Sequence, residues 1–125
     1  MLLTSGEEVA SGASLYGTRE LPGETLIAVE IVPVMPEYDL ANDARPVAIW
    51  ADGTGPYDVG LTTNIVRAAR DVGLEIQEAV LSAFGSDAGL ARKAGAVPRS
   101  ACVGFPAEHT QGYEVAHLGG ISRKS

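Results

Sequence analysis

The sequence predicts an α/β fold, with a largely parallel sheet flanked by helices. Short apolar segments typical of strands alternate along the chain with segments in which apolar residues recur at helical spacing. The clearest strand is apolar on both pleat faces, which is typical of strands that helices cover on both sides. Short turns between the segments favour right-handed crossovers between parallel strands. With 125 residues, the chain has the size of a single domain.

Four strands are expected. The clearest covers residues 26–32 (LIAVEIV), where Glu30 is the one charged residue. The other strands are expected over residues 47–51, 76–83 and 99–104, and a loop is expected over residues 106–112. Residues 1–4 form a short apolar stub that we expect to be the end of a further strand.

Two helices are expected. The first begins near Leu61, with Thr62 or Thr63 as its N-cap, and Gly73 is a natural residue to end it. The second is short, opens at residues 85–87 with Ser86 or Asp87 as its N-cap, and ends at Gly95. No closing helix is evident before Ser125, so the chain is expected to be part of a larger domain.

Composition excludes several classes of function. The 9 basic and 16 acidic residues give a net charge of -7 and a pI of about 4.7, and no local basic patch is present, so nucleic acid is not expected as a partner. No apolar run approaches the roughly 18 residues of a membrane span, and the N-terminus does not resemble a signal peptide. A single cysteine, Cys102, fits a reducing compartment. We therefore expect a cytoplasmic protein that does not bind membranes.

Carboxylates and one imidazole lie in or just after the predicted strands. They are Glu7, Glu8, Glu30, Asp52 and His109. In open sheets, reactive groups gather outside the carboxyl ends of the strands. Oxygen and nitrogen ligands of this kind suit zinc, cobalt or manganese, and a glutamate beside such a metal can act as a general base.

Each of these residues also has a purely structural interpretation. The two adjacent glutamates could belong to a solvated turn, and Glu30 could form a structural ion pair. Asp52 could form a turn before a glycine, Asp87 could cap a helix, and His109 could be an ordinary exposed or core histidine. Taken one by one, the residues leave the function open.

Four segments in order carry a resemblance. They are residues 4–9 (TSGEEV), 29–33 (VEIVP), 85–89 (GSDAG) and 104–109 (GFPAEH). Together they resemble the glutamyl/deblocking aminopeptidase family of dinuclear metallopeptidases, whose members include tetrahedral assemblies. The resemblance covers nearly the whole chain but only the later half of the family's catalytic domain. It implies a zinc-peptidase-like α/β fold, with residues 1–125 as one partial catalytic domain.

The resemblance also implies a site. Glu7 would be the general base, Glu8 a ligand of one metal ion shared with His109, and Glu30 a ligand of the other. The intact enzyme would hold two divalent ions, zinc or cobalt, cleave peptides at a free N-terminus and form a homo-oligomer. The family more often has aspartate at the position of Glu30, and its first histidine ligand and bridging aspartate lie upstream of the glutamate pair. The 125 residues alone are therefore expected to be inactive.

The alternative is a protein of another class. A non-catalytic α/β module that binds a partner or associates with itself would use the unpaired edge and the uncovered apolar face that a partial sheet presents.

Overall fold

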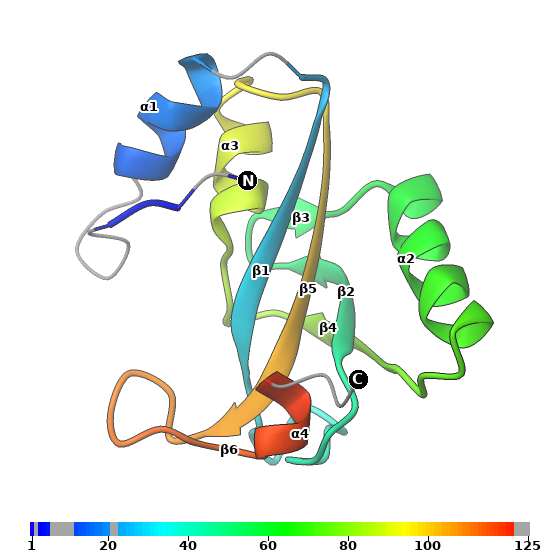
Figure 1. Ribbon diagram of the computed structural model, residues 1–125. Helices are drawn as coiled ribbons and strands as arrows, with labels where there is room; N and C mark the ends of the chain where they lie inside the picture. The colour runs from blue at the N-terminus through cyan, green and yellow to red at the C-terminus, as the bar shows by residue number, and fades with distance from the viewer. Residues whose placement is uncertain (2, 6–11, 21–22, 122–125) are drawn as a thin grey trace.

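The computed structural model describes residues 1, 3–5, 12–20 and 23–121. Figure 1 shows how the helices and strands follow one another along the chain. In order they are α1 (Gly12–Glu20), β1 (Thr25–Pro33), β2 (Val47–Asp52), β3 (Gly55–Pro56), α2 (Val59–Asp71), β4 (Gln77–Leu81), α3 (Asp87–Lys93), β5 (Arg99–Glu108), β6 (Val115–Ala116) and α4 (Leu118–Ile121).

The strands form one mixed sheet. β1 pairs with β5, β5 with β2, and β2 with β4, while the two-residue strands β3 and β6 pair with β2 and β5. β1 and β5 are parallel, β2 and β4 are parallel, and β2 and β5 are antiparallel. The predicted α/β class, with a sheet flanked by helices, is confirmed. The sheet is less uniform than expected, because an antiparallel step joins its two parallel pairs.

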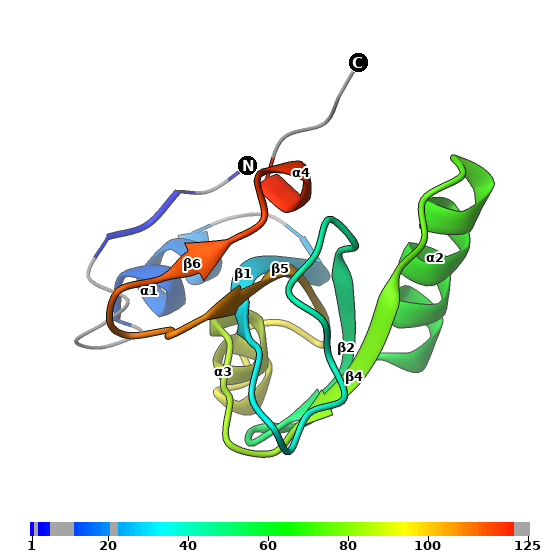
Figure 2. The ribbon, with the colours of Figure 1, turned by 90° about the horizontal axis from the view of Figure 1, so that it is seen from below.

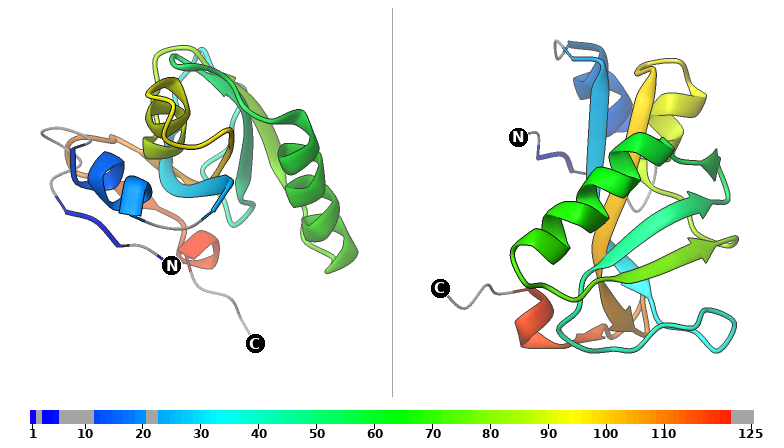
Figure 3. Two further views of the ribbon diagram at one scale, coloured as in Figure 1. Left: turned by 90° about the horizontal axis from the view of Figure 1, so that it is seen from above. Right: turned by 90° about the vertical axis from the view of Figure 1, so that its right-hand side faces the viewer.

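Helices lie on both sides of this sheet. Views from below and above place α3 and α4 on opposite sides of the β1–β5 pair, with α1 next to α3 (Figures 2 and 3). Helix α2 packs against β2 and β5 and crosses in front of β5 in the right-hand view of Figure 3. In the part of the chain that the structure describes, no helix is long and apolar enough to span a membrane.

The core lies between the sheet and α3. Its buried residues come from β1, β2, β4, β5, α3 and the connecting loops, and they are Val32, Tyr38, Val47, Ile49, Tyr57, Leu81, Ala88 and Cys102. Along β1 the side chains alternate, so Leu26 and Ala28 pack against this core whereas Ile27 and Val29 point away from it. Among the described residues, helices therefore cover β1 on one face only, although its apolar sequence predicts cover on both.

Local side-chain chemistry sets the helix boundaries. Asp58 caps α2, and its Oδ1 accepts a hydrogen bond from the backbone N–H of Leu61 at 2.8 Å. The expected caps Thr62 and Thr63 lie inside the helix, so that prediction was wrong by one turn. Gly73 follows the helix with φ +74°, as its predicted place at the C-terminus requires.

Two stretches differ from the sequence prediction. β5 continues to Glu108, although a loop was expected from Pro106. On one side of β5, pairing with β2 ends at Gly104 and pairing with β6 starts only at Ala107. Pro106 therefore has a strand neighbour, β1, on its other side only, and a proline is tolerated at such an edge position. Helix α1 was not expected either, and the described residues of the N-terminal stub belong to no strand.

Stability at low pH is expected to depend on Asp58. Hydrogen bonds from Arg99 and from the Leu61 amide lower the pKa of this carboxyl from 3.8 to about 2. The folded protein therefore keeps Asp58 ionised at pH values at which the unfolded chain protonates it. This contribution to stability is complete above about pH 4 and is lost as the pH falls through about 2. In urea titrations at pH 2 to 6, Asp58→Asn should flatten the dependence of the unfolding free energy on pH; an unchanged slope would contradict this.

Candidate functional site

A buried polar cluster lies at the carboxyl end of β2, and Asp52 is its centre. One carboxylate oxygen of Asp52 accepts hydrogen bonds from the backbone N–H and the hydroxyl of Thr54, at 2.7 and 2.6 Å. The other accepts from the Tyr57 hydroxyl and, at 3.1 Å, from the Ser86 N–H. Asp52 is only 7% exposed, so these four donors replace water around a buried carboxylate.

The cluster joins two parts of the chain that lie far apart in sequence. The Tyr57 hydroxyl is also 2.7 Å from the Ser86 hydroxyl oxygen, which accepts from the Gly89 N–H at 3.0 Å as the N-cap of α3. The turn after β2 and the start of α3 are therefore held by one carboxylate. Gly89 is required for this approach, because a Cβ there would overlap the Thr54 hydroxyl.

Glu30 lies next to this cluster. The backbone N–H of Asp87, the first residue of α3, donates to Glu30 Oε1 at 3.4 Å. Glu30 shares the core-facing side of β1 with Ala28 and Val32, and its backbone pairs with Gly104. One carboxylate oxygen of Asp87, Oδ1, is buried and has no hydrogen-bond partner among the described residues.

Burial keeps two ionisable groups here neutral, the Tyr57 hydroxyl and the thiol of the nearby Cys102. Burial, together with donation to Asp52, raises the pKa of the Tyr57 hydroxyl well above its usual value, so Tyr57 remains a donor. Burial and the nearby Glu30 carboxylate raise the pKa of Cys102 to about 12. Cys102 is completely buried in the core, which agrees with the structural role expected for it.

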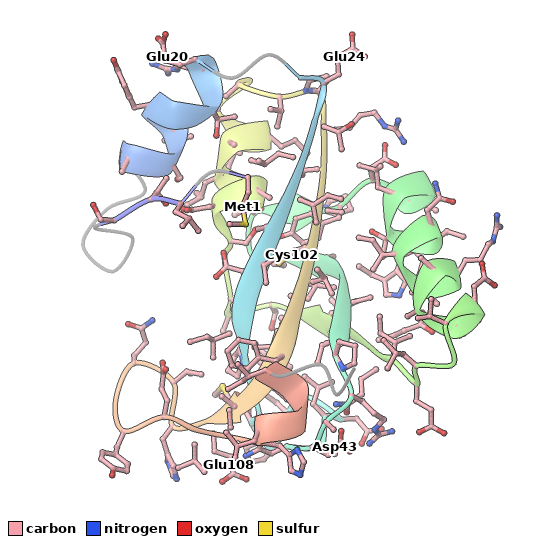
Figure 4. All side chains as sticks on the ribbon, in the orientation of Figure 1. Met1, Glu20, Glu24, Asp43, Cys102 and Glu108 are labelled. Carbon is pink, nitrogen blue, oxygen red and sulfur yellow. The ribbon has the colours of Figure 1, made fainter. Side chains whose placement is uncertain are left out.

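The structure places the predicted site residues as follows. Glu7 and Glu8 lie outside the described residues. Glu30 lies in the middle of β1, and His109 comes directly after β5, is exposed and has φ 57°. Glu30 is paired with Gly104 on β5. Glu108, the residue before His109, lies four residues further along this strand, which corresponds to about 13 Å. Figure 4 shows the same arrangement, with Cys102 in mid-sheet and Glu108 at the far end of β5.

The described residues do not assemble a metal site by themselves. Within residues 12–20 and 23–121, and the few described before them, no three His, Cys, Asp or Glu side chains gather closely enough to hold an ion. Glu30 and His109 supply two candidate ligands at separate points of the β1–β5 pair. The described residues therefore supply no three-ligand set for a metal ion.

Sequence analysis missed the central role of Asp52. It was assigned to a turn before Gly53, and the hydrogen bond from Thr54 N–H confirms such a turn. Its second carboxylate oxygen and its burial were not foreseen. Its position at the end of a buried strand had already placed Asp52 among the candidate polar residues, but no sequence signal identified Tyr57 and Ser86 as its partners.

With this geometry established, comparison with solved structures identifies the fold. The TET1 peptidase of Pyrococcus horikoshii, described as assembling into a tetrahedron or a large octahedral shell, superimposes with a TM-score of 0.82 at 20% identity, over 95% of this chain and 36% of that one. The TET aminopeptidase of Thaumarchaeota archaeon SCGC AB-539-E09 superimposes with a TM-score of 0.79 at 18% identity, over 87% of this chain and 32% of that one. The aminopeptidase APDkam598 of Desulfurococcus kamchatkensis has a TM-score of 0.79 at 17% identity, over 94% of this chain and 36% of its own. The chain thus has the fold of part of a TET peptidase and spans about a third of the length of these relatives.

A family model then gives the family. The model described as M42 glutamyl aminopeptidase matches residues 1–124, so the chain belongs to the M42 glutamyl aminopeptidase family. The resemblance drawn from the four sequence segments is thereby confirmed. Among curated protein sequences, none matches the chain.

Removing the charge of Asp52 should destabilise the fold. In Asp52→Asn an NH2 group replaces one of the two oxygens, each of which accepts from one hydroxyl and one backbone N–H. The hydroxyl can reorient, but the backbone N–H loses its partner. We expect the unfolding free energy to fall by about 3 kcal/mol, measured by urea denaturation followed by circular dichroism. The matched control is Asp39→Asn, an exposed loop position, which should change stability by less than about 0.5 kcal/mol. Equal effects of the two substitutions would show that Asp52 does not have the role described.

Proposed function

We propose that this chain is part of the catalytic domain of a metal-dependent aminopeptidase, which hydrolyses peptide bonds at a free N-terminus. The observation that carries the proposal is the family match over residues 1–124. The fold shared with TET peptidases, at TM-scores of 0.79 to 0.82, supports it. Divalent zinc or cobalt ions, when bound, would act as Lewis acids on the scissile carbonyl.

The proposed roles of individual residues follow from their positions in the family pattern. Glu7 is proposed as the general base, and Glu8 and His109 as ligands of one ion. Glu30 is proposed as a ligand of the second ion. Its place beside the start of α3, where the Asp87 N–H donates to it, gives this carboxylate a fixed orientation. Glu30 lies in the middle of β1 and His109 follows the end of β5, and we assign them to different ions.

Two further proposals concern the protein as a whole. Because the chain spans about a third of its structural relatives, we propose that the 125 residues alone have little or no peptidase activity. TET peptidases assemble into dodecamers and larger shells, which supports self-association of this chain too. We also propose a cytoplasmic location, on the basis of its single, buried cysteine.

The purified chain is expected to bind metal without showing robust peptidase turnover. With zinc or cobalt and an aminoacyl-nitroanilide, we expect no robust turnover, because the chain spans only about a third of the length of its structural relatives. Calorimetric titration with zinc should still detect weak binding, because Glu8, Glu30 and His109 remain. Glu8→Ala and His109→Ala should each reduce this affinity about tenfold or more.

His117→Ala is the matched control, since His117 is also an exposed histidine that follows a strand. It should leave the zinc affinity unchanged. Robust turnover would refute the proposed inactivity. Zinc binding that is absent, or equally insensitive to all three substitutions, would refute the ligand assignment and favour a non-catalytic α/β module that binds a partner or a second copy.

A further inference from the structure

His117 comes directly before helix α4 and caps it with its side chain. The backbone N–H of Gly119, the second residue of the helix, donates to His117 Nδ1 at 3.0 Å. The N–H of Gly120 donates to the His117 carbonyl oxygen at 2.9 Å. A side chain that accepts from the second N–H of a helix has the role of an N-cap. The cap of α4 is therefore an imidazole nitrogen, an acceptor that protonation removes.

Two glycines bring α4 close to the rest of the molecule. A Cβ on Gly119 would be only 2.9 Å from the Cβ of Ala44. A Cβ on Gly120 would be 3.3 Å from the Asp43 carbonyl oxygen and 3.5 Å from the Cβ of Phe105. Figure 4 shows Asp43 beside α4. A helix of four residues is too short to be stable by itself, so both its cap and this close contact are needed to keep α4 in place.

Protonation of His117 removes the cap. A neutral imidazole has one donor and one acceptor nitrogen, whereas both nitrogens of the charged ring are donors. Protonated Nδ1 would therefore meet the Gly119 N–H as one donor against another. Histidine is the side chain that ordinarily changes its charge between about pH 5 and 8. Docking of α4 is thus favoured at pH values at which the ring is neutral, and it weakens as the pH falls and the ring becomes charged.

The charged groups of the loop before β2 do not reverse this direction. Asp43 would attract a charged His117 ring, but Arg45 donates to both Asp43 carboxylate oxygens at 2.6 to 3.1 Å. These hydrogen bonds are the main reason that the pKa of Asp43 is low, and the charge of His117 makes the smallest contribution. Exposed ion pairs stabilise a fold only weakly. The loss of the cap therefore outweighs the attraction to Asp43.

The two strands next to α4 add no opposing charge. β5 contacts α4 through Phe105, which is uncharged. Glu108 of β5 lies three residues further along that strand, opposite the start of β6. Glu114, the residue before β6, accepts from the Gln111 N–H at 3.4 Å and so belongs to the preceding turn. The hydrogen bond to Nδ1 therefore determines how α4 responds to pH.

We propose that His117 is a pH-sensitive cap, which holds α4 against β5 and the loop before β2 when its ring is neutral and releases α4 when the ring is protonated. Strand β6 should stay in place throughout, because the Val115 carbonyl oxygen accepts from Asn42 Nδ2 at 2.9 Å and this amide does not titrate. The inference goes beyond the proposed function, and it depends neither on metal binding nor on peptidase activity.

Solution NMR of the full 125-residue chain, without metal, tests the proposal between about pH 5 and 8. The contact to follow is the nuclear Overhauser effect between the Gly119 α-protons and the Ala44 methyl group. The ratio of docked to released α4 should fall about fivefold as the ring becomes charged, because one hydrogen bond is lost. The Gly119 amide shift and the His117 ring protons should titrate with one midpoint. A contact that is independent of pH, or two separate midpoints, would refute the proposal.

Three variants test whether His117 is the residue responsible. His117→Asn places an oxygen acceptor that does not titrate near the position of Nδ1, so α4 should stay docked at every pH. His117→Ala removes the acceptor, so the contact should be weak at every pH. His109→Asn is the matched control, because it replaces the only other histidine, and asparagine tolerates the φ of 57° there. It should preserve the pH dependence of the wild-type chain.

A pH dependence that persists in His117→Asn, or that disappears in His109→Asn, would overturn the proposal. Circular dichroism establishes that each variant is folded. If one of them is not, the shared midpoint of Gly119 and His117 still decides the question, because it is measured on the wild-type chain.

Discussion

The buried carboxylate of Asp52 is the interaction on which this end of the sheet depends. Four donors from three positions, Thr54, Tyr57 and Ser86, converge on it. A carboxylate that is 7% exposed is costly unless its oxygens are satisfied, and the same donors lose their partners if it is removed. The turn after β2 and the start of α3 must therefore form together, although more than thirty residues lie between Asp52 and Ser86.

This constraint reaches Glu30 through α3. Ser86 caps the helix while its N–H is held by Asp52, and the next N–H along the chain, that of Asp87, donates to the Glu30 carboxylate. The orientation of Glu30, a proposed metal ligand, thus depends on the hydrogen bonds between Asp52 and Ser86, neither of which is a proposed ligand. Hydrogen bonds around ligating carboxylates commonly tune metal sites in this way. The segment around His109 has no comparable support from the described residues, since it is an exposed turn beyond the end of β5.

Periodicity and turn chemistry predicted most of the fold. The strand at 26–32, the glycines that end α2 and α3, and the Ser86 cap follow from local rules and are present. Failures occurred where distant partners decide the outcome. Pro106 continues β5 because of where its neighbours end, and Asp58 caps α2 while paired with Arg99, forty-one residues away. The role of Asp52 was missed for the same reason, since two of its four donors, those of Tyr57 and Ser86, lie outside its own turn. The family was found from four short segments because their order, unlike any single residue, is specific.

Native-state hydrogen exchange tests the central role of Asp52 most directly. The N–H groups of Thr54 and Ser86 both donate to its carboxylate, so they should exchange only when the whole domain unfolds. The N–H of Gly112, in the exposed turn after β5, provides a reference for local opening. Protection of Thr54 and Ser86 that equals the global unfolding free energy is the predicted result. Exchange at either position as fast as at Gly112 would contradict it, because the cluster would then open without the rest of the fold.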